Sequence, residues 1–406
     1  MRRSFLVIAL LLLVGTFLRL PPYFFPSSSA LHPRPGFQNV GFDEGLYCNY
    51  IKSLDAAGIS SYPEIAERYI IEQTRLPGAV LPPTRFLYIF FSYLWHAATG
   101  QDALNSLKFV SSLFSIFLLL VATVFALRAG GEKIGAAVCA LMVFAPTQVH
   151  MSQHALIDGF FAFWALTSLW LLWESLTHPN DWRWLVPYGL ALALMVLTKE
   201  NAFFAYIGLV AVIVVCYWQK YYPVGRFLIA ATVIGPLLGA AILVNLCGSL
   251  PSTIHIYQLL VSKASVLPYA IATGDGPWYR YLIDLLIVSP IVLIFAFGGL
   301  FTLRRTDKMP VIFFSFIAAS YILMANVRYG MNLRYANMWD MPLRYLAVFG
   351  LTNICDRVGT AARWLFPAAV AGLCLFEWHQ YLVFFVHHNL YELVTGGLLR
   401  AIQVLK

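Results

Sequence analysis

The sequence is poor in charge. Of its 406 residues only 11% are Asp, Glu, Lys or Arg, whereas 60% are hydrophobic. Soluble domains carry roughly 25% charged residues, and apolar runs of about 20 residues recur along this chain. These runs also lack the period-two alternation of a membrane barrel. The scarcity of charge therefore excludes a soluble protein and predicts an all-α polytopic membrane protein.

Other signatures are missing as well. The six cysteines show no CxxC spacing, so no zinc knuckle is predicted, and a Cys48–Cys247 disulfide is left open. There is no Gly-rich phosphate motif, heptad run or strong internal repeat. The net charge is +8, but the basic residues fall in ones and twos between apolar blocks. This distribution indicates membrane topology and contact with anionic headgroups, and no nucleic acid is expected as a partner.

The topology follows from the basic residues. The N-terminus, MRRSFLVIALLLLVGTFLRLPP, predicts an uncleaved signal anchor with Arg2 and Arg3 in the cytoplasm. The block at 86–98 is too short to span comfortably, so we place it along the membrane surface. The basic connections between the later blocks are then cytoplasmic, as the positive-inside rule requires. This predicts about eleven transmembrane helices, with residues 387–406 outside.

Two external regions result. The first, residues 21–103, begins with a Pro/Ser-rich stretch and then contains GFDEGLY, in which Asp43 and Glu44 are adjacent. Tyr47, Tyr50, Ile51 and Leu54 follow at helical spacing and form one apolar stripe, which predicts a short helix lying on the bilayer. The second region, residues 248–280, reads as a loop.

This topology gathers a set of ionisable residues on the external face. They are Asp43, Glu44, Arg85, His154, Asp158, Lys199, Glu200, Asp275, Arg328 and Arg334. Ionisable groups are costly near a bilayer and usually serve a function there. Two adjacent carboxylates suit a general base, a metal ligand or a helix cap.

Each of these residues also has a purely structural interpretation. Asp43 could cap a helix that starts near Gly45. Asp158 could cap or favour the start of the next span, with His154 hydrogen-bonded to it. Lys199 and Glu200 could neutralise each other. Arg328 and Arg334 could extend to lipid headgroups.

The order of motifs resembles a known superfamily. An anchor helix is followed by FDEGLY, PPTRFLYIFFSYLW, SQHALIDGFFAFW, LTKENAFF and a late NLRYANMWDMPLRY segment. This order is similar to that of the GT-C membrane glycosyltransferases, above all the protein O-mannosyltransferases and the aminoarabinose transferases of lipid A. The resemblance covers roughly the first 200 residues and the late segment. Gln153 stands where the family's SR…LD pattern has Arg, and no soluble C-terminal domain is expected after the last span.

The resemblance implies a fold, an activity and a site. It implies a GT-C bundle with a catalytic module at 1–247, a C-terminal membrane region at 248–406 and no soluble domain. The implied enzyme is a hexosyl- or pentosyltransferase that moves a sugar from a polyprenyl-phosphate carrier to an acceptor hydroxyl. The acceptor is a lipid, a polysaccharide or a protein. The implied location is the bacterial inner membrane, with the active site facing the periplasm or exterior.

Within that resemblance each candidate has a role. Asp43 is the expected general base, and Glu44 orients the acceptor or holds a cation. Arg334, then Arg328, are the candidates for the lipid phosphate, because a guanidinium matches it best. Lys199 adds a further charge, and Arg85 is a weaker choice. His154, Asp158 and Glu200 complete the substrate-binding set.

Two questions stay open from the sequence. A carboxylate pair serves with or without Mg²⁺ or Mn²⁺, so a divalent-cation cofactor is left undecided. A lipid-linked polysaccharide ligase or polymerase, and a transporter or flippase, are the rival functions. Transporters often contain paired inverted repeats, and this sequence shows none.

Overall fold

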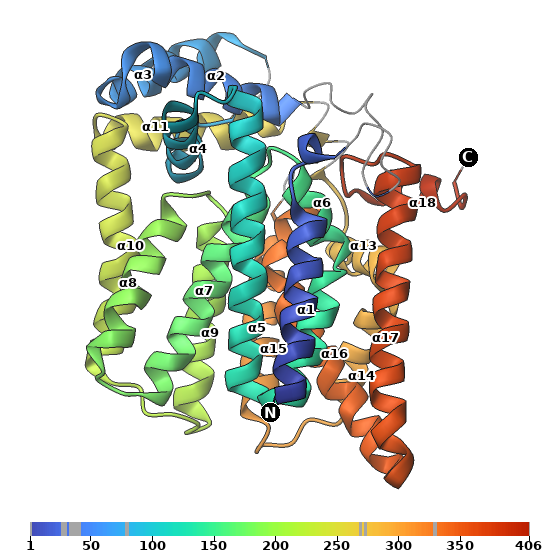
Figure 1. Cartoon of the computed structure of the whole chain (residues 1–406). Coiled ribbons are helices and arrows are strands. Elements are labelled where there is room, and N and C mark those ends of the chain that lie inside the picture. Colours follow the sequence, from blue (N-terminus) through green and yellow to red (C-terminus); the bar gives the residue numbers. More distant parts are fainter. Residues whose placement is uncertain are drawn as a thin grey trace.

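A computed structural model describes residues 2–25, 31, 42–77, 81–267, 270–271, 274–327 and 331–405. These residues form helices and connecting turns, with no strand among them. The predicted all-α class is therefore confirmed. Figure 1 shows long helices side by side and a layer of shorter helices across one end. We call this the external layer; it consists of α2 (Phe42–Ala57), α3 (Tyr62–Arg75), α4 (Phe86–Thr99) and α11 (Leu250–Ala264).

The bundle beneath the layer contains most of the chain. Its helices are α1 (Arg2–Arg19), α5 (Ala103–Val143), α7 (Ile157–Thr177), α8 (Trp182–Val196), α9 (Ala202–Trp218), α10 (Arg226–Leu246), α13 (Arg280–Val288), α14 (Pro290–Leu300), α15 (Lys308–Met324), α16 (Asp340–Cys355) and α17 (Ala362–Tyr381). Shorter elements connect them near the external layer: α6 (Pro146–Gln153), the 3-10 segment η4 (Leu333–Trp339), the π-helical η6 (Leu382–His387) and α18 (Thr395–Ala401).

Some of these helices are long and apolar enough to cross a membrane. In the described part of the chain, four helices are long and apolar enough to span a bilayer: Ala103–Val143, Ile157–Thr177, Arg226–Leu246 and Arg363–His387. A fifth results if α13 and α14, which meet at 118°, form one broken span. Several shorter apolar helices lie beside them. The figure of about eleven spans therefore stays a prediction.

α5 is a hairpin of two helices. Gly131, at φ 76°, interrupts its helical backbone with a left-handed residue that glycine adopts without strain. Arg19 contacts both the Ser115 hydroxyl and the Val143 carbonyl, at 3.2 and 3.1 Å. Those residues would lie about 42 Å apart along one straight helix. The chain therefore reverses at Gly131, so the two halves of α5 lie side by side.

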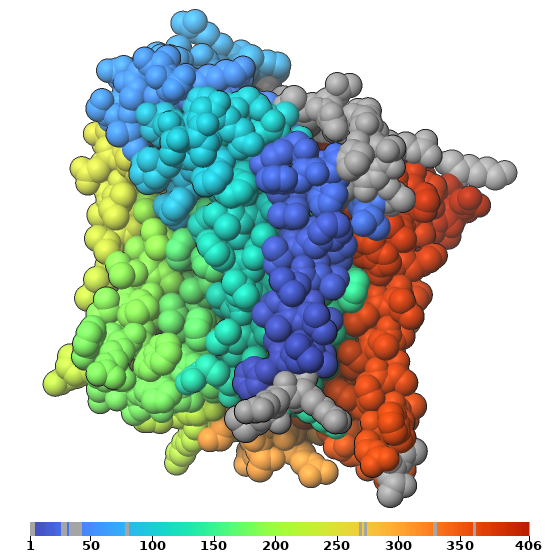
Figure 2. Space-filling model, in the orientation of Figure 1, coloured from blue at the N-terminus to red at the C-terminus, as the bar shows by residue number. Residues whose placement is uncertain are grey.

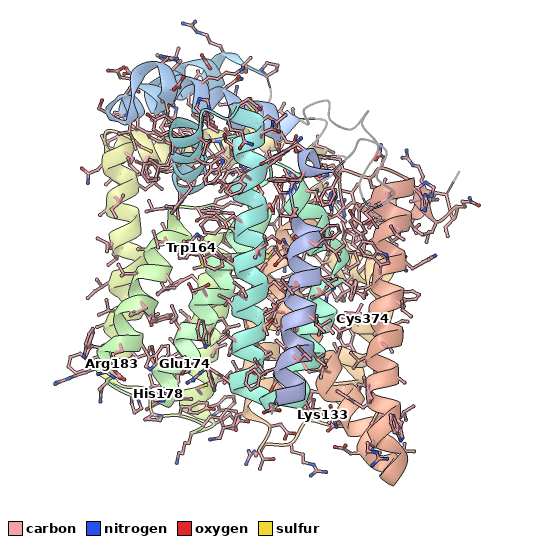
Figure 3. The ribbon with its side chains drawn as sticks, viewed as in Figure 1. Lys133, Trp164, Glu174, His178, Arg183 and Cys374 are labelled. Carbon is pink, nitrogen blue, oxygen red and sulfur yellow. The ribbon has the colours of Figure 1, made fainter. Side chains whose placement is uncertain are left out.

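The surface of the bundle is apolar. Phe5, Leu6, Leu10 and Leu13 of α1 are all more than half exposed, and α1 lies on the outside of the bundle in Figure 2. The end opposite the external layer carries charge instead: Lys133, Glu174, His178 and Arg183 are labelled there in Figure 3. Arg128 pairs with the buried Glu174 at that end. An apolar belt between two polar ends is what a bilayer requires.

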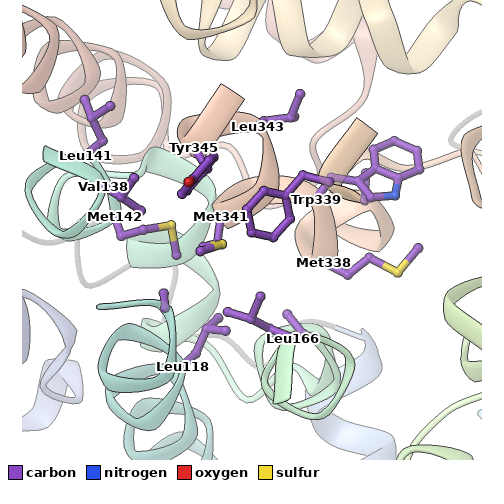
Figure 4. Close-up of a cluster of buried hydrophobic side chains, with 14 of the residues drawn as sticks. Leu118, Val138, Leu141, Met142, Leu166, Met338, Trp339, Met341, Leu343 and Tyr345 are labelled. Carbon is purple, nitrogen blue, oxygen red and sulfur yellow. The ribbon is translucent and has the colours of Figure 1, made fainter. Parts of the chain in front are cut away.

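Two hydrophobic cores hold the layers together. The larger one fills the bundle, and Figure 4 shows part of it, with Leu118, Leu166 and Met341 among the labelled side chains. The smaller one lies beneath the external layer. The predicted apolar stripe of α2 belongs to it: Tyr47, Ile51 and Leu54 are fully buried. The prediction that this face lies on the bilayer is wrong, because α4 and α5 already cover α2.

The second external region also differs from its prediction. Residues 248–280 were expected to form a loop, but Leu250–Ala264 form helix α11. The Ser249 hydroxyl accepts a hydrogen bond from the Ser252 N–H and caps it, and Pro251 sits in the first turn. Thr253, Ile256 and Leu259 are its buried face. Cys48 and Cys247, the pair left open for a disulfide, are both free thiols.

Candidate active site

Arg334 is the centre of the charged cluster. It lies in η4 and is buried. Its Nη2 donates to Asp43 Oδ2 at 2.7 Å, its Nη1 lies 3.4 Å from Glu392 Oε1, and its Nε lies 3.6 Å from Asp158 Oδ2. Burial alone would lower the pKa of Arg334, but these carboxylates outweigh it and hold the pKa well above its ordinary value. The guanidinium is therefore a fixed positive charge.

Lys199 forms the second cation of the site. Its Nζ lies 2.5 Å from Asp158 Oδ1 and 4.0 Å from the centre of the Tyr335 ring. Burial lowers the pKa of Lys199 below its ordinary value, although Asp158 opposes this shift. Asp158 lies in the first turn of α7 but is held by the two cations. Ion pairing, rather than capping, is the contact its side chain makes.

Glu44 joins α2 to the start of α7. Its Oε1 accepts hydrogen bonds from the Ala155 N–H at 2.9 Å and, at 3.3 Å, from His154 Nδ1. Burial would raise the pKa of Glu44, but the His154 contact, the charges of His154 and Lys108, and the Ala155 N–H together lower it. The expected His154–Asp158 contact is thus replaced by a His154–Glu44 contact. Helix α2 starts at Phe42, so Asp43 lies inside its first turn rather than capping a helix at Gly45.

Arg85 belongs to a separate ion pair beside the cluster. Its Nη2 and Nε both contact the Glu200 carboxylate, the second at 3.2 Å, and its Nη1 donates to the Tyr47 hydroxyl at 2.9 Å. The pKa of Glu200 is lowered, because the charges of Arg85 and Lys199 outweigh its burial. Lys199 and Glu200 therefore contact different partners and do not form a self-neutralising pair. Arg85 is occupied by protein groups on both sides of its guanidinium.

Glu392 was not among the predicted site residues. It follows η6 and reaches Arg334 from the C-terminal segment, while its Oε2 accepts from Asn332 Nδ2 at 2.5 Å. A backbone bond from Leu333 N–H to the Leu393 carbonyl joins the same two segments. A signal was available in the sequence: Glu392 is the only acidic residue after Glu377.

The predicted candidates divide into those brought together and those that are not. The structure assembles Asp43, Asp158, Lys199 and Arg334 around one point, with Glu44 and His154 on one side. Arg328 lies outside the described residues. Asp43 and Arg334 come from opposite sides of the predicted boundary at 247/248, so a site built on this cluster draws on both regions.

The fit of these residues to a metal ion is poor. In the part of the chain that the structure describes, no group of three or more His, Cys, Asp or Glu side chains is arranged to hold a metal. The reason is visible in the contacts: Asp43, Asp158 and Glu392 converge on a guanidinium, and Glu44 binds His154.

The cluster combines two chemical capabilities. Asp43 is largely buried, with 12% of its side chain exposed, and its carboxylate can accept a proton from a hydroxyl. Arg334 and Lys199 present two buried cations that can stabilise an anionic leaving group. This is the pairing that a displacement at an anomeric carbon needs, with a base on one side and an anion acceptor on the other.

One family model matches part of the chain. The model of the dolichyl-phosphate-mannose-protein mannosyltransferases matches residues 90–273. The match contains His154, Asp158, Lys199 and Glu200 but neither Asp43 nor Arg334. No curated protein matches the chain in sequence.

Solved structures share the fold. The oligosaccharyltransferase of Archaeoglobus fulgidus superposes with a TM-score of 0.61 at 12% identity, over 93% of this chain and 55% of that one. The oligosaccharyltransferase AglB of Archaeoglobus fulgidus, in complex with an inhibitory peptide and a dolichol-phosphate, has a TM-score of 0.59 at 12% identity, over 94% of this chain and 55% of that one. ArnT of Cupriavidus metallidurans, bound to undecaprenyl phosphate, gives 0.59 at 14%, over 98% and 75%. The chain thus spans about half the length of the oligosaccharyltransferase. These matches confirm the resemblance to the GT-C membrane glycosyltransferases and the GT-C fold.

Proposed function

We propose that this protein is a membrane glycosyltransferase that moves a sugar from a polyprenyl-phosphate carrier to an acceptor hydroxyl on the non-cytoplasmic side. The observation that carries the proposal is the contact of Arg334 with Asp43 and, through Asp158, with Lys199. It places a carboxylate base beside two buried cations at one end of an apolar bundle. The mannosyltransferase family match and the shared fold with ArnT and the oligosaccharyltransferase support the same assignment.

The donor phosphate is assigned to Arg334. A sugar linked to polyprenyl phosphate is a phosphodiester with one negative charge, as is each carboxylate that now contacts the guanidinium. Glu392 is the contact best placed to give way, because its side chain, at 15%, is the most exposed of the three carboxylates. The phosphate replaces it without changing the net charge around Arg334.

The chemical step then uses Asp43 as the base. The acceptor oxygen attacks the anomeric carbon and loses its proton to the Asp43 carboxylate. The bond from that carbon to the phosphate oxygen breaks, and the polyprenyl phosphate leaves as a monoester with one more negative charge. Arg334 and Lys199 stabilise that growing charge in a site with little water. The transition state is oxocarbenium-like, so charge stabilisation on the leaving side carries much of the rate.

The remaining residues hold this arrangement. Glu44 and His154 join α2 to the loop that leads into α7, and Arg85 joins α2 through Tyr47 to Glu200. We assign these residues to positioning rather than to phosphate binding. The external layer faces the periplasm or exterior, since the basic residues Lys133 and Arg183 lie at the opposite end.

A transfer assay tests the proposal. The purified protein is incubated with a panel of undecaprenyl- and dolichyl-phosphate-linked hexoses and pentoses, and the released polyprenyl phosphate is quantified. We expect release that depends on Asp43 and Arg334. A transporter or flippase would bind such lipids without breaking the sugar–phosphate bond. Absence of release across the panel, with lipid binding intact, would overturn the glycosyltransferase assignment in favour of transport.

A further inference from the structure

A second polar cluster lies inside the bundle, below the charged site. Its members are Arg19, Gln148, Ser289, Asn337, Asp340, Arg344 and Glu377, and all of them are buried. We call it the polar layer. Two arginines and two carboxylates balance its charge. Burying such groups in a membrane protein is costly unless they are paired, and they usually serve a function.

The two arginines bind the end of α5. Helix α6 starts with Pro146, which has no N–H, so the Met142 carbonyl loses its usual helical donor. Arg19 Nη2 donates to that carbonyl at 2.6 Å, and Arg19 Nη1 donates to the Val143 carbonyl at 3.1 Å. Arg344 Nε donates to the Leu141 carbonyl at 3.1 Å. Two cations at a helix C-terminus also favour its dipole.

Arg344 connects this helix end to two further elements. Its Nη1 donates to Asp340 Oδ1 at 2.9 Å, at the start of α16, and its Nη2 donates to Glu377 Oε2 at 2.6 Å, in α17. Ser289, at the break between α13 and α14, donates to the same Glu377 oxygen at 3.0 Å. One guanidinium therefore joins α5, α16 and α17.

Gln148 closes the layer from the side of α6. Its Nε2 donates to Asp340 Oδ2 at 2.7 Å and to the Asn337 carbonyl at 3.2 Å, and it also contacts the Asn337 side chain. Asn337 belongs to η4, three residues after Arg334. Gln148 belongs to α6, six residues before His154. The layer thus fixes η4 against α6.

Three chain segments leave this layer and enter the active site. Helix α6 leads to His154 and Asp158, η4 carries Arg334, and α17 continues through η6 to Glu392. These are the segments whose carboxylates and guanidinium meet in the site. We propose that Arg344 is a positioning residue, which sets the distances between Arg334, Asp158 and Glu392 through the polar layer. The inference rests on the proposed function only for its choice of ligand.

Arg344→Lys is the test variant, because it keeps the charge but replaces three separate donor nitrogens in a planar fork with a single ammonium nitrogen. Arg128→Lys is the matched control, since Arg128 also pairs with a buried carboxylate, at the opposite end of the bundle. Undecaprenyl phosphate affinity is measured by native mass spectrometry on folded protein. We expect Arg344→Lys to weaken binding by about tenfold or more, because small displacements in a site have large effects. Arg128→Lys should leave it unchanged.

A double-mutant cycle separates positioning from general stability. If Arg344 acts through Arg334, the Arg334→Lys variant and the double variant should bind undecaprenyl phosphate equally weakly. Additive losses, or wild-type affinity in Arg344→Lys, would overturn the inference. If Arg344→Lys does not fold, Gln148→Met replaces it in the cycle, with the same expectation.

A second measurement needs no ligand, so it separates this inference from the proposed function. Backbone hydrogen exchange is followed at residues 154–158 and 333–335 in wild type and variants. Arg344→Lys, or Gln148→Met, should increase exchange in both segments, and Arg128→Lys should not. Unchanged exchange in the polar-layer variants would contradict the inference even if lipid binding failed. The opposite result is also informative. If the polar-layer variants show the expected increase in exchange but the wild type binds no undecaprenyl phosphate, the result counts against the proposed function alone.

Discussion

Arg334 Nη2 and Asp43 Oδ2 lie 2.7 Å apart, although the two residues are separated by 291 positions in the chain. The proposed base and the proposed phosphate ligand thus touch each other in the same structure. The contact fixes the first turn of α2 against η4.

The role of Asp43 leads to the first prediction. Asp43→Asn keeps the size and polarity of the side chain but removes its ability to accept a proton. We expect transfer to fall by about 10² to 10⁴, the usual contribution of a general base. Undecaprenyl phosphate binding should persist, because Arg334 is intact. Transfer at the wild-type rate in a sugar-release assay would show that another group is the base.

The phosphate assignment gives a second prediction. Arg334→Lys retains a positive charge but loses the fork of donors that faces Asp43, Asp158 and Glu392. We expect weaker binding of undecaprenyl phosphate together with slower transfer. Arg183→Lys is the control, because Arg183 is exposed at the opposite end. If Arg334→Lys and Arg183→Lys bound undecaprenyl phosphate equally well, the phosphate would bind at a site other than Arg334.

Substitution of Glu392 is predicted to strengthen the binding of undecaprenyl phosphate, in contrast to substitution of Arg334. In our account its carboxylate occupies the position of the phosphate, so Glu392→Gln removes a competing negative charge. We expect tighter binding of undecaprenyl phosphate by a few-fold, which is the range expected for one partly exposed charge contact. A lipid titration of the two proteins measures the difference. Weaker binding in Glu392→Gln would mean that Glu392 supports the ligand rather than competing with it.

The lowered pKa of Glu44 predicts how the stability of the protein changes at acidic pH. Its pKa in the folded state lies below the ordinary value of 4.5, so its contacts contribute full stability above that value. The contribution is lost as the pH falls from about 4.5 through the lower folded pKa. The melting temperature of Glu44→Gln should therefore depend less on pH in that window than that of wild type. If the melting temperatures of Glu44→Gln and wild type changed equally with pH in that window, Glu44 would not contribute to the pH dependence of stability.

The orientation in the membrane can be tested with single cysteines. All six native cysteines are buried free thiols, so they give a low background. Lys52 in α2 and Arg183 in the first turn of α8 are exposed at opposite ends. In intact cells, Lys52→Cys should react with a membrane-impermeant maleimide, and Arg183→Cys should react only after permeabilisation. The reverse pattern would place the site in the cytoplasm.

The all-α bundle was predictable, because long apolar blocks with little charge indicate membrane helices. The stripe of Tyr47, Ile51 and Leu54 was placed on the wrong surface, because helical spacing identifies an apolar face but not what covers it. Helix α11 was missed for a related reason. Its Ser249 cap and Pro251 read as loop signals in sequence, although both also start helices.

The site shows the same limit. Motif order brought Asp43, Asp158, Lys199 and Arg334 together, but it could not choose partners for them. His154 contacts Glu44 rather than Asp158, and Glu200 contacts Arg85 rather than Lys199. Such choices depend on tertiary distances of a few ångströms. Glu377 and Glu392 lie in segments without a recognisable motif, and the NLRYANMWDMPLRY motif does not show which partners Arg344 contacts, so only the folded arrangement reveals these contacts.

The most direct test of the account is an experimental structure with undecaprenyl phosphate bound. We expect its phosphate against Arg334, at the position of the Glu392 carboxylate, within reach of Lys199 and with Asp43 on the side where an acceptor would enter. The polyprenyl tail should leave toward the apolar belt of the bundle. A phosphate bound at the opposite end, near Arg128 or Arg183, or one that makes no contact with Arg334, would contradict the account.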